Sequence, residues 1–140
     1  MPDSVRTSIG GALAALLVGA LLAIPAIAAG QTPERLEADA RDVLQRYSAA
    51  LAGLDADAVK KVQPSIDVEN LKKAFREMKA LEVSIDSIKV LSSDAATARV
   101  GCRVTQVLTP KAGSRRTTAV TRVLRLRRSD GGWVIDSFER

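Results

Sequence analysis

The apolar residues of this chain change their spacing near residue 80, from the period of a helix to the period of a strand. Up to that point they recur every three or four residues, which gathers them on one face of a helix. Beyond it they alternate with polar residues, which gathers them on one face of a sheet. Helices followed by a run of strands predict an α+β domain, in which three helices pack on a curved, four-stranded antiparallel sheet.

Three helices are predicted before the change of period. The first covers residues 31–54, and its apolar stripe consists of Leu36, Ala40, Val43, Leu44, Tyr47 and Leu51. A short second helix begins at Asp55, because a carboxylate there can accept hydrogen bonds from the free N–H groups of a helix start. The third covers residues 67–79 and carries Phe75 and Met78 on its apolar face.

The predicted strands are joined by short turns. The first strand changes phase between Ile85 and Ile88, and a bulge near positions 86–87 would restore a single apolar face. The apolar face of the second consists of Ala96, Ala98, Val100, Cys102 and Val104. The corresponding face of the third consists of Thr118, Val120, Arg122, Leu124 and Leu126. The fourth, over residues 133–138, follows an Asp-Gly-Gly turn of the kind that hairpins prefer.

The N-terminal segment has the composition of an export signal. Residues 7–33 carry no charge, and Pro25 breaks their apolar run just before the small residues Ala26-Ile27-Ala28. We predict a signal peptide over residues 1–28 and a single domain over residues 29–140, periplasmic or secreted. An uncleaved anchor in the inner membrane is the alternative, because the uncharged span is long enough to cross a bilayer of ~30 Å. Only in that case would the chain contact a membrane.

Composition excludes several kinds of site. The chain has no histidine and one cysteine, so it lacks the usual ligands of a transition-metal site and cannot form an internal disulfide. We predict no metal and no cofactor. Residues 31–94 contain 10 basic and 12 acidic side chains, whereas residues 95–140 contain 10 basic and 3 acidic ones. The aromatic residues are few and are not interleaved with the arginines, which argues against a nucleic-acid partner.

Arg122 interrupts the apolar face of the third strand. If the apolar faces of the second and third strands lie on the same side of the sheet, Arg122 lies beside Cys102 and faces the core. A guanidinium there needs an acid, a carbonyl or a bound anion, because its desolvation costs several kcal/mol. An internal ion pair, or a bulge that turns Arg122 outward, is the alternative. Tyr47 faces the same interior from the first helix, and its hydroxyl also needs a hydrogen-bond partner, which the cavity rim could supply.

At Tyr47 the sequence resembles a known family. The segments Gln45-Arg46-Tyr47 and Ala49-Ala50-Leu51, followed by Asp55, resemble the first helix of the ketosteroid isomerases. These enzymes belong with the SnoaL-like proteins to the nuclear transport factor 2-like superfamily. The closing strands of that superfamily are similar to Val123-Leu124-Arg125-Leu126 and to the Gly131-Gly132-Trp133 hairpin. The resemblance covers nearly all of residues 34–138 and implies a cystatin-like roll around a pocket.

The resemblance also implies roles for two residues. In ketosteroid isomerases the tyrosine that matches Tyr47 donates a hydrogen bond to the developing oxyanion. The second donor of that family is an aspartic acid, and Arg122 occupies its position here. No residue matches the family's general base, and the His-Asp pair of the superfamily's dehydratases cannot exist without histidine. We therefore predict no catalytic residues, since a fold alone does not transfer activity.

These observations predict an exported, non-catalytic domain that binds a small apolar or anionic ligand in a cone-shaped pocket. Arg122 would hold the anionic end of the ligand, and Tyr47 would offer a second hydrogen bond. The predicted ligand-binding residues are Tyr47, Arg122, Phe75, Cys102 and Trp133, with Val100, Val104 and Leu124 as further lining.

Two other functions remain open at this stage. The first is an isomerase or dehydratase-like activity on a small apolar ketone, which requires an acid near the cavity mouth; Asp67, Glu69 and Asp136 are the candidates. The second is a protein-interaction module that uses the basic outer face of the sheet, where Arg99, Arg103 and Arg125 are expected. The resemblance also implies a homodimer formed through the sheet.

Overall fold

The helices precede the sheet, as the change of period predicts. The computed structural model describes residues 32–139, and within them α3 (Pro33–Ala52), α4 (Ala56–Val62) and α5 (Val68–Arg76) come first. Asp55 is the N-cap of α4, and its Oδ1 accepts a hydrogen bond from the backbone N–H of Ala58 over 3.0 Å. The Asp67 carboxylate caps α5 in the same way. Both caps satisfy N–H groups that have no partner within their own helix.

The third helix is shorter than predicted. It ends at Arg76, with Glu77 as its C-cap, and Met78 already belongs to the first strand. Met78 lies three residues beyond Phe75, a spacing that fits a helix equally well. In the structure Met78 instead pairs with Pro110 across the sheet. Pairing with a neighbouring strand therefore overrides the local helical period here.

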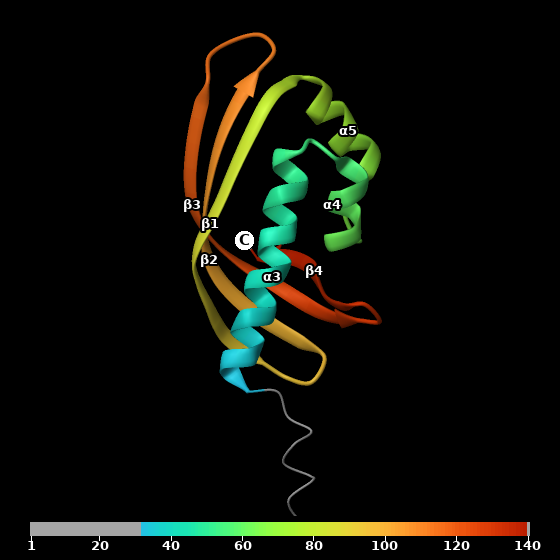
Figure 1. Ribbon diagram of the computed structural model, residues 1–140, viewed down its shortest axis with the longest axis vertical. Helices are drawn as coiled ribbons and strands as arrows, with labels where there is room; N and C mark the ends of the chain where they lie inside the picture. The colour runs from blue at the N-terminus through green and yellow to red at the C-terminus, as the bar shows by residue number, and fades with distance from the viewer. Residues whose placement is uncertain (1–31, 140) are drawn as a thin grey trace, which may run out of the picture. The chain divides into compact units, whose positions relative to one another are not determined.

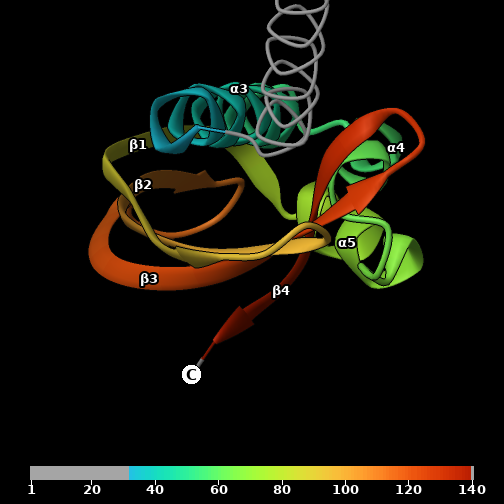
Figure 2. The same cartoon turned by 90° about the horizontal axis from the view of Figure 1, so that it is seen from below.

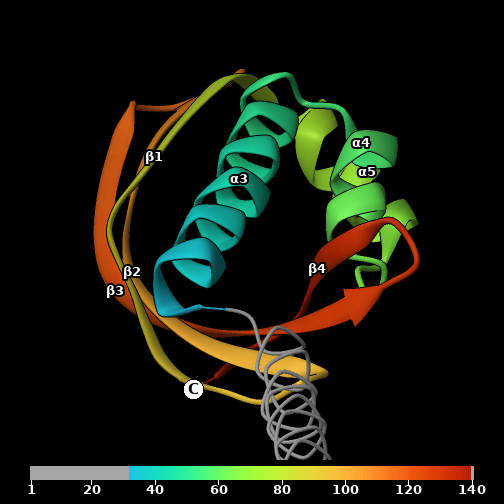
Figure 3. The same ribbon diagram turned by 60° about the horizontal axis from the view of Figure 1, so that its bottom comes forward.

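Four strands form one antiparallel sheet in the order β1-β2-β3-β4. Their bounds are Met78–Ser93, Thr97–Pro110, Arg116–Ser129 and Gly132–Glu139. Ser129 pairs with Gly132, so the last hairpin turns over Asp130 and Gly131, as predicted. Gly132 has a φ of 118°, which a residue with a side chain rarely adopts. The sheet curls around α3, which lies along its concave face (Figures 1 and 3).

The predicted bulge in β1 is confirmed. The pairing of β1 with β2 shifts between Asp86 and Lys89, and Ser87 has a φ of 55° in the left-handed region. Ile85 lies before the shift and Ile88 after it, yet both pack against the same hydrophobic core. One extra residue thus keeps both halves of this long strand facing α3.

The interior divides into two hydrophobic clusters. The larger one joins the N-terminal half of α3 to β2, β3 and β4, and includes Val43, Leu44, Leu124 and Ile135, each at most 1% exposed. The smaller one joins the end of α3 to α4, α5 and β1. Tyr47 packs against both clusters from the middle of α3. Viewed from below, α4 and α5 lie beside the sheet and leave much of its curved face to α3 (Figure 2).

The predicted export signal over residues 1–28 lies outside the described residues. Within residues 32–139, no helix is both long and apolar enough to span a bilayer.

Candidate functional site

A cavity of about 310 Å³ lies between α3 and the concave face of the sheet. α3 supplies one wall, and β1, β2 and β3 supply the other, with Phe138 added from β4. Its twelve lining residues are Leu44, Tyr47, Leu51, Val83, Ile85, Val104, Gln106, Thr118, Val120, Arg122, Leu124 and Phe138. The volume is at the small end of the range for ligand pockets, about 300–1,000 Å³.

Tyr47 and Arg122 lie in this cavity and influence each other electrostatically. Burial raises the pKa of the Tyr47 phenol, and the positive charge of Arg122 partly offsets that rise. The Tyr47 ring is fixed by Phe138, whose ring centroid lies 6.0 Å away at an interplanar angle of 47°. Because the phenol keeps its proton at neutral pH, it can donate a hydrogen bond into the cavity.

Arg122 lies on the concave face but is exposed to solvent. The pairing of β2 with β3 runs without a shift from Thr97↔Arg127 to Leu108↔Arg116, so no bulge turns Arg122 outward. Arg122 pairs with Cys102, as predicted. The expected buried ion pair is not found: among residues 32–139, Arg122 forms no hydrogen bond and no ion pair. It instead lines the cavity at its open side and is exposed.

Three predicted site residues lie outside the cavity lining. Phe75 is buried in the smaller cluster, beside a separate surface pocket bounded by α4 and α5. Trp133 is buried in the larger cluster under the guanidinium of Arg128, 4.8 Å from its ring centroid. Cys102 is only 2% exposed, and its pKa is raised by burial and by the nearby charge of Asp86. It belongs to the core, and so does Val100, which is fully buried.

The cavity contains residues that the prediction did not include. Gln106 and Thr118 pair across β2 and β3, and Val83, Leu51 and Phe138 contribute apolar surface. The pairing of Cys102 with Arg122 already implies that Gln106 faces Thr118 four residues further along. The sequence therefore contained the signal, but polar residues were not counted as pocket lining.

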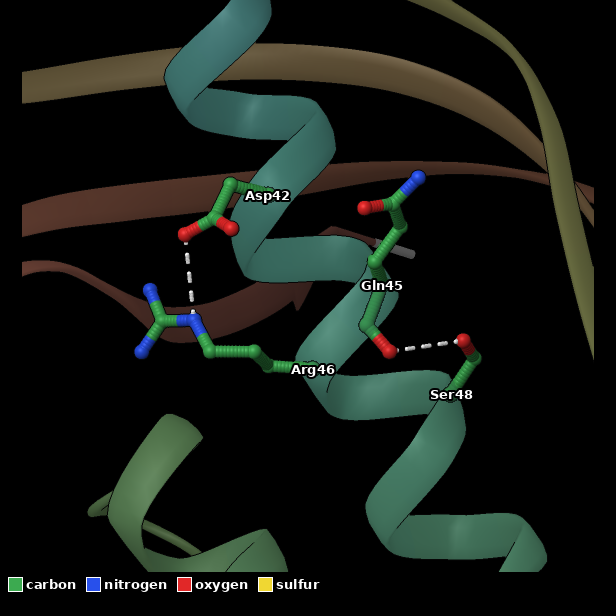
Figure 4. A network of polar contacts seen from close by, with 4 residues as sticks. All are labelled: Asp42, Gln45, Arg46 and Ser48. Carbon is green, nitrogen blue, oxygen red and sulfur yellow. Dashed lines mark hydrogen bonds and ion pairs between the residues drawn. The ribbon is translucent and has the colours of Figure 1, made fainter.

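A second, more polar pocket of about 290 Å³ adjoins the first at the bulge of β1. The two share Leu44 and Ile85, and the second adds Asp86 and Ser87 of β1. Gln45 and Ser48 of α3 line it as well, and the Ser48 hydroxyl donates to the Gln45 carbonyl over 3.0 Å (Figure 4). The charge of Asp86 adds to the effect of burial in raising the pKa of the Cys102 thiol.

The other acidic candidates have structural roles. Asp67 caps α5 through the backbone N–H of Asn70, and Glu69 lies 3.7 Å from the ammonium of Lys72 on the surface. The carboxylate of Asp136 accepts from the Nε of Arg127 over 3.3 Å. These three residues are therefore not candidates for a general base.

The outer face of the sheet is basic, as predicted, and partly neutralised. Arg99 pairs with Arg125 across the strands, and Arg99 also forms two hydrogen bonds to Glu139, of 2.9 and 3.2 Å. This interaction lowers the pKa of Glu139. Among residues 32–139, Arg103 forms no ion pair. On the opposite side of the domain, Asp42 and Arg46 pair on the exposed flank of α3 (Figure 4).

The order of the elements, the sheet pairing and the cavity between α3 and the sheet define a nuclear transport factor 2-like fold. The fold that the resemblance implied is thus confirmed. Solved structures of this class match the chain across most of its length. No family model and no curated protein matches the sequence.

Three of these structures illustrate the likeness. A candidate aromatic ring hydroxylase from Novosphingobium aromaticivorans has a TM-score of 0.67 and 18% identity, over 77% of this chain and 89% of that one. A nuclear transport factor 2-like protein from Salmonella enterica has a TM-score of 0.65 and 9% identity, over 77% and 91%. The hexachlorocyclohexane dehydrochlorinase LinA-type3 from Novosphingobium barchaimii has a TM-score of 0.57 and 10% identity, over 72% and 82%. At such identities the likeness shows the fold alone.

Proposed function

We propose that this domain binds a small molecule with an apolar body and an anionic end, and does not transform it. The observation that carries the proposal is the presence of one unpaired cation, Arg122, beside a protonated phenol in an otherwise largely apolar cavity. A carboxylate is the anion that fits best, because a guanidinium can bind its two oxygens with parallel hydrogen bonds. The Tyr47 hydroxyl can donate to the same group.

The composition of the cavity supports binding without chemistry. None of its twelve lining residues is an aspartate, a glutamate or a histidine. A positioned general base typically contributes about 10²–10⁴ in rate, and without one an isomerase or dehydratase would be slow. Phenol and guanidinium can hold an anion but cannot accept a proton from a substrate at neutral pH.

Binding of octanoate, measured by isothermal titration calorimetry, tests the proposal. Octanoate has about ten non-hydrogen atoms. The cavity volume equals that of about ten molecules of liquid water, so a ligand of this size should fit. The substitution Arg122→Met should weaken binding about 10-fold to 150-fold, because a hydrogen bond to a charged group contributes about 1.5–3 kcal/mol. Tyr47→Phe should weaken it about threefold to tenfold. The matched control is Arg125→Met, on the same strand but on the outer face. Equal affinities of the Arg122 and Arg125 variants would refute the proposal.

An enzymatic function is the second candidate, and Asp86 is the residue that would support it. Asp86 lines the pocket that adjoins the cavity, and after burial its charge is the second cause of the raised pKa of the Cys102 thiol. A small apolar ketone with an acidic α-hydrogen could use Asp86 as base and Tyr47 as oxyanion donor. Exchange of the α-hydrogen for deuterium, followed by NMR, tests this function. Loss of exchange in Asp86→Asn, with octanoate affinity unchanged, would support an enzyme.

The location of the protein is part of the proposal. An export signal over residues 1–28 would place the domain in the periplasm or outside the cell, where small ligands are scavenged or sensed. Mass spectrometry of the mature N-terminus tests cleavage after Ala28. An intact N-terminus in the membrane fraction would support the anchor instead.

The outer face of the sheet offers a third candidate function, in protein interaction. Arg103 has no ion pair among the described residues, and the pairing of Arg99 with Arg125 places like charges opposite each other. An acidic partner surface would relieve this repulsion. Substitution of Arg99, Arg103 and Arg125 by glutamate should abolish capture of such a partner and leave octanoate binding intact. A homodimer through this sheet would be detected by sedimentation equilibrium, and the same variant should alter it.

A further inference from the structure

We infer that the ligand is polar at both ends: it carries a carboxylate at Arg122 and a hydrogen-bonding group, such as a hydroxyl, at Gln106 and Thr118. The inference rests on the proposed function and specifies the class of ligand, an ω-hydroxylated or similarly terminated carboxylic acid of medium length. It is drawn from the order in which polar and apolar residues follow one another along the concave face of β2 and β3.

The register of the two strands divides the sheet wall of the cavity into three layers. Arg122 faces Cys102 in the first layer, and Val120 faces Val104 in the second. Gln106 faces Thr118 in the third layer. Arg122 and the residues of the second and third layers all line the same cavity. The wall therefore changes from cationic to apolar and then to uncharged polar.

The other wall repeats the first two layers. Tyr47 lines the same cavity as Arg122 and is close enough for the guanidinium charge to lower the pKa of its phenol against the effect of burial. Leu51 follows four residues later, about 6 Å further along the helix axis. α3 and β2 run in the same direction, so this step leads toward the Gln106 end (Figure 1). Ile85 of β1 pairs with Val104 and extends the apolar layer, whereas Val83 pairs with Gln106 beside the third layer. A ligand that lies along the strands would meet polar groups only at its two ends.

The polar layer at the far end is available to a ligand. Within residues 32–139, neither the Gln106 amide nor the Thr118 hydroxyl forms a hydrogen bond. Thr118 is exposed and Gln106 is half-buried, so both contact solvent inside the cavity mouth. An amide and a hydroxyl together offer donors and acceptors but no charge. This combination recognises a hydroxyl or a carbonyl better than it recognises a second ionised group.

The spacing of the layers sets the length of the ligand. Thr118 and Arg122 are four residues apart on β3, which corresponds to about 14 Å between their Cα atoms. The long, flexible side chain of Arg122 can span part of this separation, which leaves on the order of 10 Å between the groups that the two residues would bind. Three bonds of an extended chain span about 3.5 Å, so an extended chain of about eight or nine carbons bridges the two ends.

The test compares octanoate with 8-hydroxyoctanoate by isothermal titration calorimetry on the purified protein. The terminal hydroxyl should tighten binding about threefold to tenfold, because it gains one or two neutral hydrogen bonds. The double substitution Gln106→Leu with Thr118→Val should abolish this preference, so that octanoate and 8-hydroxyoctanoate bind the variant with equal affinity. Thr117→Val, on the same strand but on the outer face, is the matched control and should change neither affinity.

The outcomes separate the inference from the proposed function. If octanoate binds and Arg122→Met weakens it, but the hydroxyl adds nothing, the proposed function stands and the inference is overturned. The inference is also overturned if the hydroxyl helps equally in the Gln106 and Thr118 double variant. If neither acid binds at concentrations up to several millimolar, the proposed function itself fails. A shorter hydroxy acid, 5-hydroxypentanoate, should bind no better than pentanoate, because it cannot reach both layers.

Discussion

Replacing Arg122 with methionine should stabilise the domain while it weakens ligand binding. Among residues 32–139, Arg122 has no hydrogen bond and no ion pair to lose. Its neighbours on the concave face are Cys102 across the strand and Val120 and Leu124 along β3. Favourable cross-strand pairs each contribute about 0.2–1 kcal/mol, and a methionine can form them with apolar neighbours. We therefore expect the free energy of unfolding to rise by about 0.5–1.5 kcal/mol.

Thermal and urea unfolding, followed by circular dichroism, measure this effect. For a domain of about 100 residues, a gain of this size raises the Tm by roughly 2–10 °C and should leave the urea m-value unchanged. Arg125→Met is the control. Arg125 lies on the outer face near the carboxylate of Glu139, so its removal loses a favourable charge interaction and should not raise the free energy of unfolding. A loss of more than about 1 kcal/mol in Arg122→Met would mean that the guanidinium has a structural role. That result would refute the proposal that Arg122 serves to bind an anionic ligand.

Three further predictions follow from the described contacts. Tyr47 is the only tyrosine, so tyrosinate absorbance should titrate above pH 10, and Arg122→Met should raise the midpoint further because it removes the charge that lowers this pKa. Since the folded-state pKa is the higher one, the contribution of Tyr47 to stability should be lost as the pH rises through it, which alkaline melting curves can follow. Leu124→Ala should cost about 2–5 kcal/mol in urea unfolding, whereas Leu91→Ala, at a residue 48% exposed, should cost less than about 1 kcal/mol. Asp67→Ala should cost about 1 kcal/mol through the lost N-cap of α5, and a change below about 0.2 kcal/mol would contradict the capping role.

The features of the fold that could be predicted are those that depend only on which face of a strand each side chain occupies. The phase change between Ile85 and Ile88 predicted the bulge of β1, because only an extra residue lets both face the core. The face of Arg122 followed from the alternation of its neighbours in the same way. The end of the third helix could not be predicted from the sequence, since Met78 fits the apolar stripe of a helix and the apolar face of a strand equally well.

The composition of the cavity depends on packing that periodicity does not contain. Phe75 lies on the apolar side of its helix, but α5 packs on α4 and β1, at a distance from the cavity. Trp133 was predicted to bind the ligand, but the tight hairpin pairs it with Arg128, six residues beyond Arg122 along β3. A position on an apolar stripe indicates that a residue is buried in the protein interior. The register and the path of the loops decide which part of the interior it reaches.

The exposure of Arg122 follows from how little of the sheet the helices cover. Residues 116–122 of β3 are all exposed, and Val120 is 36% exposed although it faces the cavity. A ligand that lies along β3 would cover this apolar surface and pair the free guanidinium at the same time. Because such a ligand binds only the folded state, it should raise stability by about 2.7 kcal/mol at 100 times its Kd. The domain thus leaves one side of its cavity open to solvent. The apolar surface and the free guanidinium on that side favour a ligand with an apolar body and an anionic end.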